Sequence, residues 1–164
     1  MRPLRMEDRD AVAETLGDFQ VARMLADVPV PFDREDATVF LVRQTCGVLA
    51  GWSFAVTGGG DAALGAVMIG QRRGRWELAF WLNRYFWGRG YAAEAVHAVA
   101  ERFFRRMPEA ELYAGAFADN PAALKIQRRI GLAIVDCGEV YCAARGAMVS
   151  HIAMRATAEM LSRP

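Results

Sequence analysis

The chain has 164 residues, of which 54% are hydrophobic and 24% charged, and this length predicts a single domain over residues 1–164 with a sizeable core. The formal net charge of +1 excludes the strongly basic surface of a protein that binds nucleic acid or acidic lipid. We therefore expect neither a nucleic-acid nor a membrane partner.

The first third of the chain is mainly helical in pattern. The predicted segments are a short strand at 2–6 and helices at about 7–16, 19–25 and 33–49. Acidic residues at the start of the first helix suit the positive end of a helix dipole. Asp33 is a good N-cap for the third helix, with Asp36 three positions later, and Gly51 is expected to end it near Leu49.

The pattern then changes to short apolar strands separated by tight turns. Strands are predicted at 52–56, 63–69 and 76–82. Thr57-Gly58-Gly59-Gly60-Asp61 is a hairpin signal between the first two, and Arg72-Arg73-Gly74-Arg75 is a second turn. Such a meander is antiparallel.

The remainder alternates helices and strands. The predictions are a helix after Gly90 with apolar residues on one face, a strand at 112–117, a helix from Asn120-Pro121 to Ile130 with Gly131 as C-cap, and closing strands at 134–140 and 147–154. A strand, glycine turn, helix and strand in succession imply one parallel pair within a mostly antiparallel sheet, joined by a right-handed crossover.

The turn Trp87-Gly88-Arg89-Gly90-Tyr91-Ala92-Ala93 is the most informative segment. Two glycines without Cβ atoms let the backbone approach an anion closely. The helix that follows presents N–H groups without intrahelical partners at the positive end of its dipole. The segment therefore predicts a phosphate site.

Gly88-x-Gly90-x-x-Ala93 also satisfies the dinucleotide fingerprint of Rossmann folds. Such a fold places an acidic residue at the end of the next strand to bind the ribose, and here only Asp119 is available. The antiparallel character of the preceding strands argues against this interpretation. A nicotinamide-dependent (NAD) oxidoreductase stays as an unlikely alternative.

The same turn resembles the pyrophosphate loop of the GNAT superfamily of N-acetyltransferases, Gln/Arg-x-x-Gly-x-Gly/Ala, here Tyr85-Phe86-Trp87-Gly88-Arg89-Gly90. The stretch from Trp87 to Ala95 resembles the version in the RimJ/RimL-type branch, which acetylates ribosomal-protein N-termini, and in its many relatives. Asn120-Pro121-Ala122-Ala123-Leu124-Lys125 to Arg129-Ile130-Gly131-Leu132 resembles that branch's Asn-x-x-Ser … Lys-x-Gly-Phe segment. Tyr85 departs from the usual Gln/Arg, at a position that chiefly offers its backbone.

This resemblance implies an α+β GNAT fold. The sheet would have six or seven mostly antiparallel strands with one splayed parallel pair, flanked by four or five helices. Acetyl-CoA would be the co-substrate, bound in the splayed pair, and its acetyl group would pass directly to a primary amine on a protein N-terminus or a small molecule. No metal is needed.

The resemblance also implies roles for individual residues. Glu77 would be the general base that takes a proton from the amine through water, although a surface role for it is equally open. The coenzyme would contact Phe80, Trp81, Leu82, Trp87, Gly88, Arg89, Gly90, Tyr91, Ala92, Asn120 and Lys125. Asn120 is also a good helix N-cap, and the two roles are compatible.

The general acid for the departing thiolate has no clear candidate. Many family members carry a tyrosine seven residues after the asparagine, where this chain has Gln127, which cannot serve. Tyr141 or Cys142 of the distal hairpin are alternatives, and the thiolate can also leave unassisted. A non-catalytic acyl-CoA-binding module therefore stays open as a second function.

The three cysteines are an odd number, and with the two histidines they form no zinc-ligand spacing. We interpret them as reduced thiols and expect a cytoplasmic protein. The N-terminus lacks the pattern of a signal peptide, and no apolar run approaches the roughly 18 residues of a transmembrane helix. The acceptor amine and the choice between monomer and homodimer cannot be deduced from the sequence.

Overall fold

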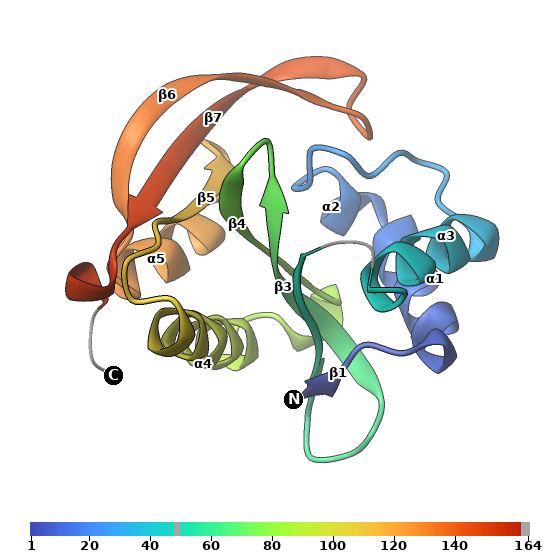
Figure 1. Ribbon diagram of the computed structural model, residues 1–164. Helices are drawn as coiled ribbons and strands as arrows, with labels where there is room; N and C mark the ends of the chain where they lie inside the picture. Colours follow the sequence, from blue (N-terminus) through green and yellow to red (C-terminus); the bar gives the residue numbers. More distant parts are fainter. Residues whose placement is uncertain (48–49, 162–164) are drawn as a thin grey trace.

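A computed structural model of the chain describes residues 1–47 and 50–161. One seven-stranded sheet runs through it in the order β1-β2-β3-β4-β5-β7-β6, in which β4–β5 is parallel and the other described pairs are antiparallel (Figure 1). The strands are β1 (Arg2–Pro3), β2 (Gly51–Thr57), β3 (Ala63–Arg72), β4 (Arg75–Leu82), β5 (Leu112–Phe117), β6 (Ala133–Cys142) and β7 (Ala147–Ala156).

Two groups of helices cover the two faces of the sheet (Figure 1). They are α1 (Arg9–Gly17), α2 (Phe19–Ala22) and α3 (Arg34–Thr45) on one face, and α4 (Tyr91–Arg106) and α5 (Pro121–Arg129) on the other. Each face has its own apolar core. Leu78 and Leu82 of β4 belong to the α4/α5 core and Trp81 to the α1–α3 core, so successive β4 side chains alternate between the two faces.

The predicted α+β fold with one parallel pair is confirmed, and local signals explain its helices. Asp33 caps α3 by accepting from the N–H groups of Glu35 and Asp36, and Asp36 returns the bond to the Asp33 N–H. Pro121 starts α5 after the cap residue Asn120. Gly131 ends that helix with a φ of 100°, which glycine adopts without strain.

Several predicted boundaries need correction. The predicted strand at 2–6 is only two residues long and is followed by a 3-10 turn at Met6–Asp8. α2 ends at Ala22 instead of Leu25. Gly51 begins β2 and does not terminate a helix, because α3 already ends at Thr45. The predicted helix end near Leu49 lies outside the described residues.

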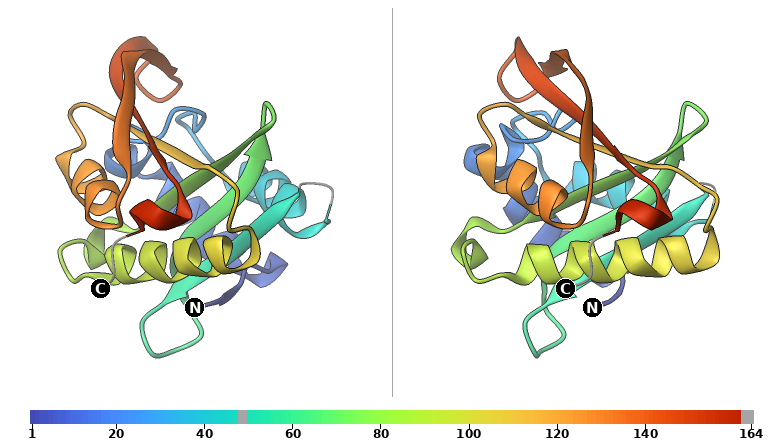
Figure 2. Two further views of the ribbon diagram at one scale, coloured as in Figure 1. Left: turned by 60° about the vertical axis from the view of Figure 1, so that its left-hand side comes forward. Right: turned by 90° about the vertical axis from the view of Figure 1, so that its left-hand side faces the viewer.

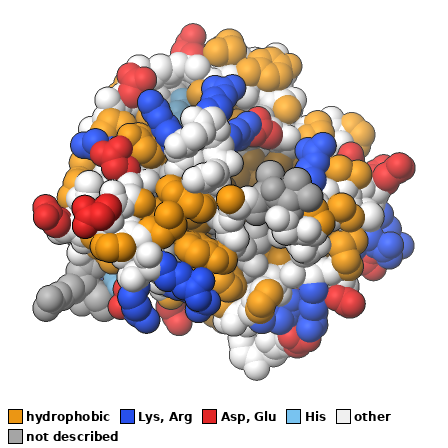
Figure 3. Space-filling view, in the orientation of Figure 1, with side chains coloured by type: hydrophobic (Ala, Val, Ile, Leu, Met, Phe, Trp, Pro, Cys, Tyr) orange, Lys and Arg blue, Asp and Glu red, His pale blue; other side chains and the backbone are white. Residues whose placement is uncertain are grey.

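Apolar side chains reach the surface between α4 and the strands on the face seen in Figure 3, with basic side chains beside them. Trp52 of β2 and Trp76 of β4 pack against the core under α4 and stack with ring centroids 6.2 Å apart. The guanidinium of Arg106 lies 5.4 Å from the centre of the Trp52 ring. Arginines of α4 thus cover aromatic rings on the strands while keeping their charge in water.

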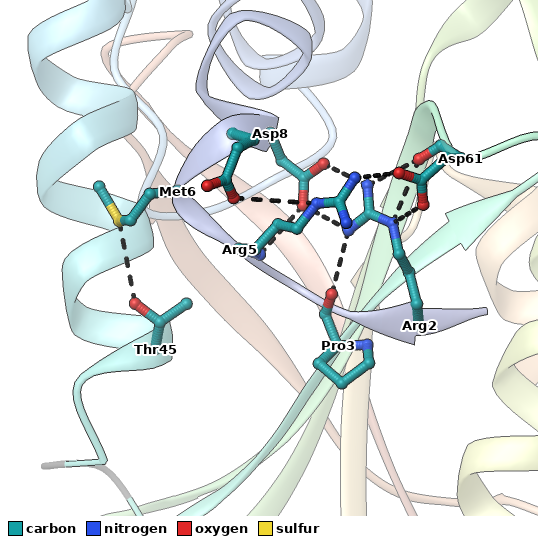
Figure 4. A network of polar contacts seen from close by, with 8 residues as sticks. Arg2, Pro3, Arg5, Met6, Asp8, Thr45 and Asp61 are labelled. Carbon is teal, nitrogen blue, oxygen red and sulfur yellow. Dashed lines mark hydrogen bonds and ion pairs between the residues drawn. The ribbon is translucent and has the colours of Figure 1, made fainter.

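A charged network fixes the N-terminus to the sheet (Figure 4). Arg2 donates to both carboxylate oxygens of Asp8, whose side chain is 4% exposed, and also to Asp61 in the β2–β3 turn. Asp8 accepts a further bond from the Arg5 N–H. Burial alone would raise the pKa of Asp8, but the bonds from Arg2 and Arg5 outweigh burial and hold this pKa below its usual value.

We expect Asp8→Asn to lower the free energy of unfolding at pH 7 by about 3 kcal/mol, because it leaves the Arg2 guanidinium without its buried partner. The contribution of Asp8 is present above the unfolded-state pKa of about 3.9 and is lost as the pH falls through the lower folded-state pKa. The difference between the two proteins should therefore shrink in acid. Urea unfolding at pH 7 and pH 3 measures it.

Asp10→Asn is the matched control, because Asp10 forms only exposed ion pairs with Arg9 and Arg34. It should cost less than about 1 kcal/mol. Equal losses for the two variants would show that the Arg2–Asp8 pair does not hold the N-terminus.

Candidate functional site

The glycine turn has the backbone geometry expected of an anion site. Gly88 and Gly90 have φ values of 73° and 85°, in the left-handed region that glycine adopts without strain. Gly90 is the N-cap of α4 and has no side chain to cap the N–H groups of the first turn. These N–H groups, beginning with Tyr91 and Ala92, lie at the positive end of the α4 dipole.

Hydrogen bonds and an ion pair hold the first part of the loop before α4, from Asn83 to Trp87. The Trp87 indole donates to the Leu82 carbonyl at 2.7 Å, although the side chain is 46% exposed. Asn83 accepts from the Tyr85 N–H and donates to Thr15 of α1. Arg84 forms an ion pair with Asp18 at 2.7 Å. These contacts fix the loop before any ligand arrives, which lowers the entropic cost of binding.

β4 and β5 are paired only at their beginnings. The register of the parallel pair consists of Trp76–Leu112 and Glu77–Tyr113. Beyond these two pairs, Leu78–Leu82 of β4 does not pair with Ala114–Phe117 of β5. We call the region between these two segments the splay. Figure 2 shows β5 running away from β4 toward the side of the molecule where α4 begins.

Along a strand, the peptide groups of successive residues point alternately to the two neighbouring strands, and this alternation shows which of them face the splay. The Asn83 N–H donates to Leu64 on β3, so Trp81, which pairs with Ala66, also directs its peptide groups to β3. Phe80 and Leu82 direct theirs to the β5 side. Of the three β4 residues predicted to contact the coenzyme, Phe80 and Leu82 therefore border the splay through their backbone, whereas Trp81 does not.

The same argument orients β5. The Ala118 N–H donates to Ser150 on β7. Since the register alternates, the peptide groups of Gly115 and Phe117 face away from β7 and toward the splay. The splay is thus bordered on both sides by strand edges that pair with no other strand. Three carbonyls on these edges accept bonds from nearby groups: Leu82 from the Trp87 indole, Gly115 from the Gln127 amide and Phe117 from the Asn120 N–H. An extended ligand with amide groups can bind along the rest of these edges as an added strand binds.

Asn120 and Lys125 lie beyond β5. Asn120 is the N-cap of α5, and its side-chain oxygen accepts from the Ala123 N–H at 3.1 Å. The predicted capping role is confirmed, and the side-chain amide nitrogen is not used by it. Lys125 is exposed on α5, so its charge is accessible to a bound anion.

Glu77 stands where the β4–β5 pairing ends. By alternation from Trp81 it lies on the α1–α3 face of the sheet, next to the exposed Ala79. Glu77 is half-buried, and its charge helps to raise the pKa of Arg72, which is raised mainly by a hydrogen bond with Asp27. Tyr113 and Gly115 continue this face on β5, because Tyr113 pairs with Glu77.

His151 of β7 lies on the same face, and the sequence analysis missed it. Its ring covers Gly115 so closely that a Cβ there would be 2.3 Å from the His151 Cε1. It also meets the Phe117 ring edge-on, with centroids 5.9 Å apart. Burial lowers the pKa of His151. No local signal marks this residue, because its neighbours come from another strand.

Arg145, predicted only as part of a turn, ties the tip of the β6–β7 hairpin to the segment after α2. Its guanidinium binds both Asp119 oxygens, at 2.8 and 3.0 Å, and donates to the Arg23 carbonyl at 2.7 Å. The hydrogen bond from Arg145 holds the pKa of Asp119 below its usual value. The hairpin tip is therefore tied both to the end of β5 and to the segment after α2.

Cys142 and Tyr141, the two candidates for a general acid, are poorly placed to protonate a leaving thiolate. Cys142 is fully buried, and its thiol donates to backbone carbonyls of Arg23 and Leu25. Tyr141 is exposed on β6. In the described part of the chain there is no cluster of three or more potential metal-ligating side chains, and no helix is long and apolar enough to cross a bilayer.

The Rossmann alternative is wrong. The strands before the glycine turn are antiparallel, and the carboxylate of Asp119, which would bind a ribose, is bound by Arg145 and Arg23. A dinucleotide fold requires parallel strands on this side of the turn.

Comparison with known proteins agrees with this geometry. The family model of the acetyltransferase (GNAT) domain matches residues 1–133. A GNAT-family acetyltransferase from Bacillus anthracis superposes with a TM-score of 0.82 at 19% identity, over 96% of this chain and 93% of that one. RimJ from Mycobacterium smegmatis, solved with a coenzyme A disulfide, gives 0.80 at 17% identity over 99% and 83%.

The ribosomal-protein-S5-alanine acetyltransferase from Vibrio fischeri is similar too, with a TM-score of 0.77 at 17% identity over 99% of this chain and 94% of that one. At these identities the similarity establishes a shared fold. The resemblance inferred from the glycine turn and the Asn120 segment is therefore confirmed at the level of the family model and of the fold.

We expect the His151 imidazole to titrate below the ordinary value of about 6.5, because burial disfavours its charged form. Its unfolded form then takes up a proton more readily than its folded form, so the free energy of unfolding falls as the pH drops through this range. NMR titration of the imidazole measures the pKa directly. A value at or above 6.5 would contradict the packing against Gly115 and Phe117.

Proposed function

The chain belongs to the GNAT acetyltransferase family, and on that premise we propose that it transfers the acetyl group of acetyl-CoA directly to a primary amine, with residues 1–164 acting as one domain. The observation that carries the proposal is the splay of β4 and β5, which leads to the open Gly88/Gly90 turn at the start of α4. The coenzyme A bound to the related RimJ supports this choice of co-substrate.

In this proposal the coenzyme pyrophosphate binds the N–H groups of the glycine turn and the first turn of α4. The contacting residues are Trp87, Gly88, Arg89, Gly90, Tyr91 and Ala92. Arg89 and Lys125 supply positive charge, and both are exposed. The pantetheine arm lies in the splay against the backbone of Phe80 and Leu82, within reach of the Asn120 amide nitrogen.

The acceptor amine approaches from the α1–α3 face, where Glu77 lies at the end of the β4–β5 pairing. An amine must lose its proton before it attacks a thioester, and Glu77 accepts this proton through water. The neutral imidazole of His151 is the second candidate base, because it lies on the same face of the sheet as Glu77. Most of the rate enhancement comes from holding amine and thioester together.

The acceptor is a protein N-terminus or a small-molecule amine. The similarity to a ribosomal-protein-S5-alanine acetyltransferase favours a protein N-terminus. The protein acts as a monomer or homodimer and uses no metal. A protein that binds acyl-CoA without turnover is the competing function, and release of the coenzyme thiol in the presence of amines distinguishes the two.

We expect Gly90→Glu to abolish binding of acetyl-CoA, because it places a side chain and a negative charge against the pyrophosphate. Calorimetric titration measures the affinity. Gly74→Glu is the matched control: Gly74 also has a positive φ (78°) and open space around it, but lies in the β3–β4 turn at the opposite end of β4. A side chain at a positive φ destabilises both variants by about 1–2 kcal/mol, but only Gly90→Glu should fail to bind acetyl-CoA.

We expect Glu77→Gln to lower turnover at neutral pH by about 10²-fold, the lower range for general-base catalysis, with acetyl-CoA affinity unchanged. The assay is thiol release with an amine found by screening peptides with free N-termini and small amines. Glu14→Gln, an exposed change on α1, is the control. Wild-type turnover in Glu77→Gln would remove this residue as the base and direct attention to His151.

A further inference from the structure

β6 is the outermost strand on its side of the sheet. Among the described strands it pairs only with β7, and Figure 1 shows it on the outer side of the curved β6–β7 hairpin. Of its ten residues, eight are exposed. Natural proteins commonly protect a sheet edge by shortening it or by placing lysine or proline on it. β6 has neither residue and is long, whereas β1 at the opposite edge has two residues. β6 therefore offers an accessible edge with which a further strand can pair.

The direction of the backbone hydrogen bonds shows which groups this edge offers. The Ala118 N–H donates to the Ser150 carbonyl, so the peptide groups of the next β7 residue, His151, face β6. His151 pairs with Gly138, and the register is regular from Asp136 to Cys142. The β6 residues whose peptide groups point away from β7 are therefore Cys137, Glu139 and Tyr141.

Local contacts satisfy only one of these three outward N–H groups. The Cys137 N–H donates to the Asp136 carboxylate at 2.8 Å. The N–H groups of Glu139 and Tyr141 bond to no group in the part of the chain that the structure describes. Two donors and the carbonyls beside them are thus available to an added strand.

The charge of the edge indicates what kind of strand fits it. β6 carries two carboxylates, Asp136 and Glu139, and no basic residue. Both side chains are exposed, and neither forms an ion pair with a described residue. Because they are three positions apart, they lie on opposite faces of the strand. Opposite charges on neighbouring strands stabilise a sheet, so a strand with basic residues on both faces fits this edge.

A second copy of this chain fits the same edge less well. Antiparallel pairing of two β6 strands centred on residues 138–140 would place the two Glu139 side chains directly or diagonally opposite, within about 7–8 Å. A centre outside this range meets the irregular register at Val135, or the hairpin tip, where the Ala143 N–H already donates to the Ala26 carbonyl. Like charges at such positions are destabilising.

We propose that β6 is a docking edge for an extended, basic segment of a partner protein, which adds to the sheet as a further strand. The segment bonds to the outward peptide groups of Glu139 and Tyr141, as in other cases of strand addition. Its arginine or lysine side chains pair with the carboxylates of Asp136 and Glu139. This surface is separate from acetyl transfer, so the inference does not depend on the proposed function.

The test uses the peptide acetyl-Val-Val-Arg-Ser-Val-Arg-amide, which places arginines opposite both carboxylates when it pairs antiparallel to β6. It has no primary amine and therefore cannot be an acetyl acceptor. NMR titration of the labelled protein should shift the amide signals of residues 137–141. We expect Glu139→Lys to weaken binding about tenfold. Glu109→Lys is the matched control, because it makes the same charge change at an exposed position outside the sheet and should leave the affinity unchanged.

A second pair of measurements separates backbone pairing from charge. Tyr141→Pro removes one outward N–H and leaves the bonds to β7 intact, as proline on an edge strand does, so it should also weaken binding about tenfold. The peptide with glutamate in place of both arginines should not bind wild-type protein. This second comparison leaves the protein unchanged and holds even where a variant does not fold.

Three results would overturn the inference. One is the absence of shifts in the β6 amides with the arginine peptide. Another is equal binding of the arginine and glutamate peptides, or equal affinity in Glu139→Lys and Glu109→Lys. The third is self-association of the wild-type protein through β6 in sedimentation equilibrium without binding of the peptide, which would assign the edge to a second copy of the chain.

Discussion

The architecture of the candidate site depends on the early end of the β4–β5 pairing. The two parallel strands share only the positions Trp76–Leu112 and Glu77–Tyr113. Past this point, β4 still pairs with β3 and β5 still pairs with β7. The edges that β4 and β5 turn toward each other have no strand partner. Unpaired backbone groups are costly when buried. The splay is therefore stable because helices, loop and side chains such as Trp87 and Gln127 satisfy part of these edges.

The proposed coenzyme side of the site was largely predictable, because its signals are local. The strand, the two glycines and the amphipathic helix follow one another in the sequence, and each is marked by residues whose conformational preferences are strong. The Asn120-Pro121 helix start is equally local. The structure reproduces these elements to within a few residues, including β5 over Leu112–Phe117. Local signals did not reveal the direction of the backbone hydrogen bonds. The peptide groups of Trp81 point toward β3, and those of Phe80 and Leu82 point toward the splay.

The proposed acceptor side was not predictable in the same way. His151 faces Gly115 across a strand pair, and Arg145 binds Asp119 and the Arg23 carbonyl. These contacts join residues 26 to 122 positions apart, and they depend on the β5–β7 register and on the docking of the hairpin tip. Neither is encoded in a short motif. The side chains of the proposed acceptor side are therefore recognised only in the three-dimensional structure, whereas the backbone elements of the proposed coenzyme side are visible in the sequence.

The central claim is that the splay and the glycine turn together bind acyl-coenzyme A. Calorimetric titration of the wild-type protein with acetyl-CoA, with NAD titrated in parallel, tests it most directly. The account predicts micromolar binding of acetyl-CoA and no binding of NAD. Absence of acetyl-CoA binding would contradict it, whatever the result with NAD.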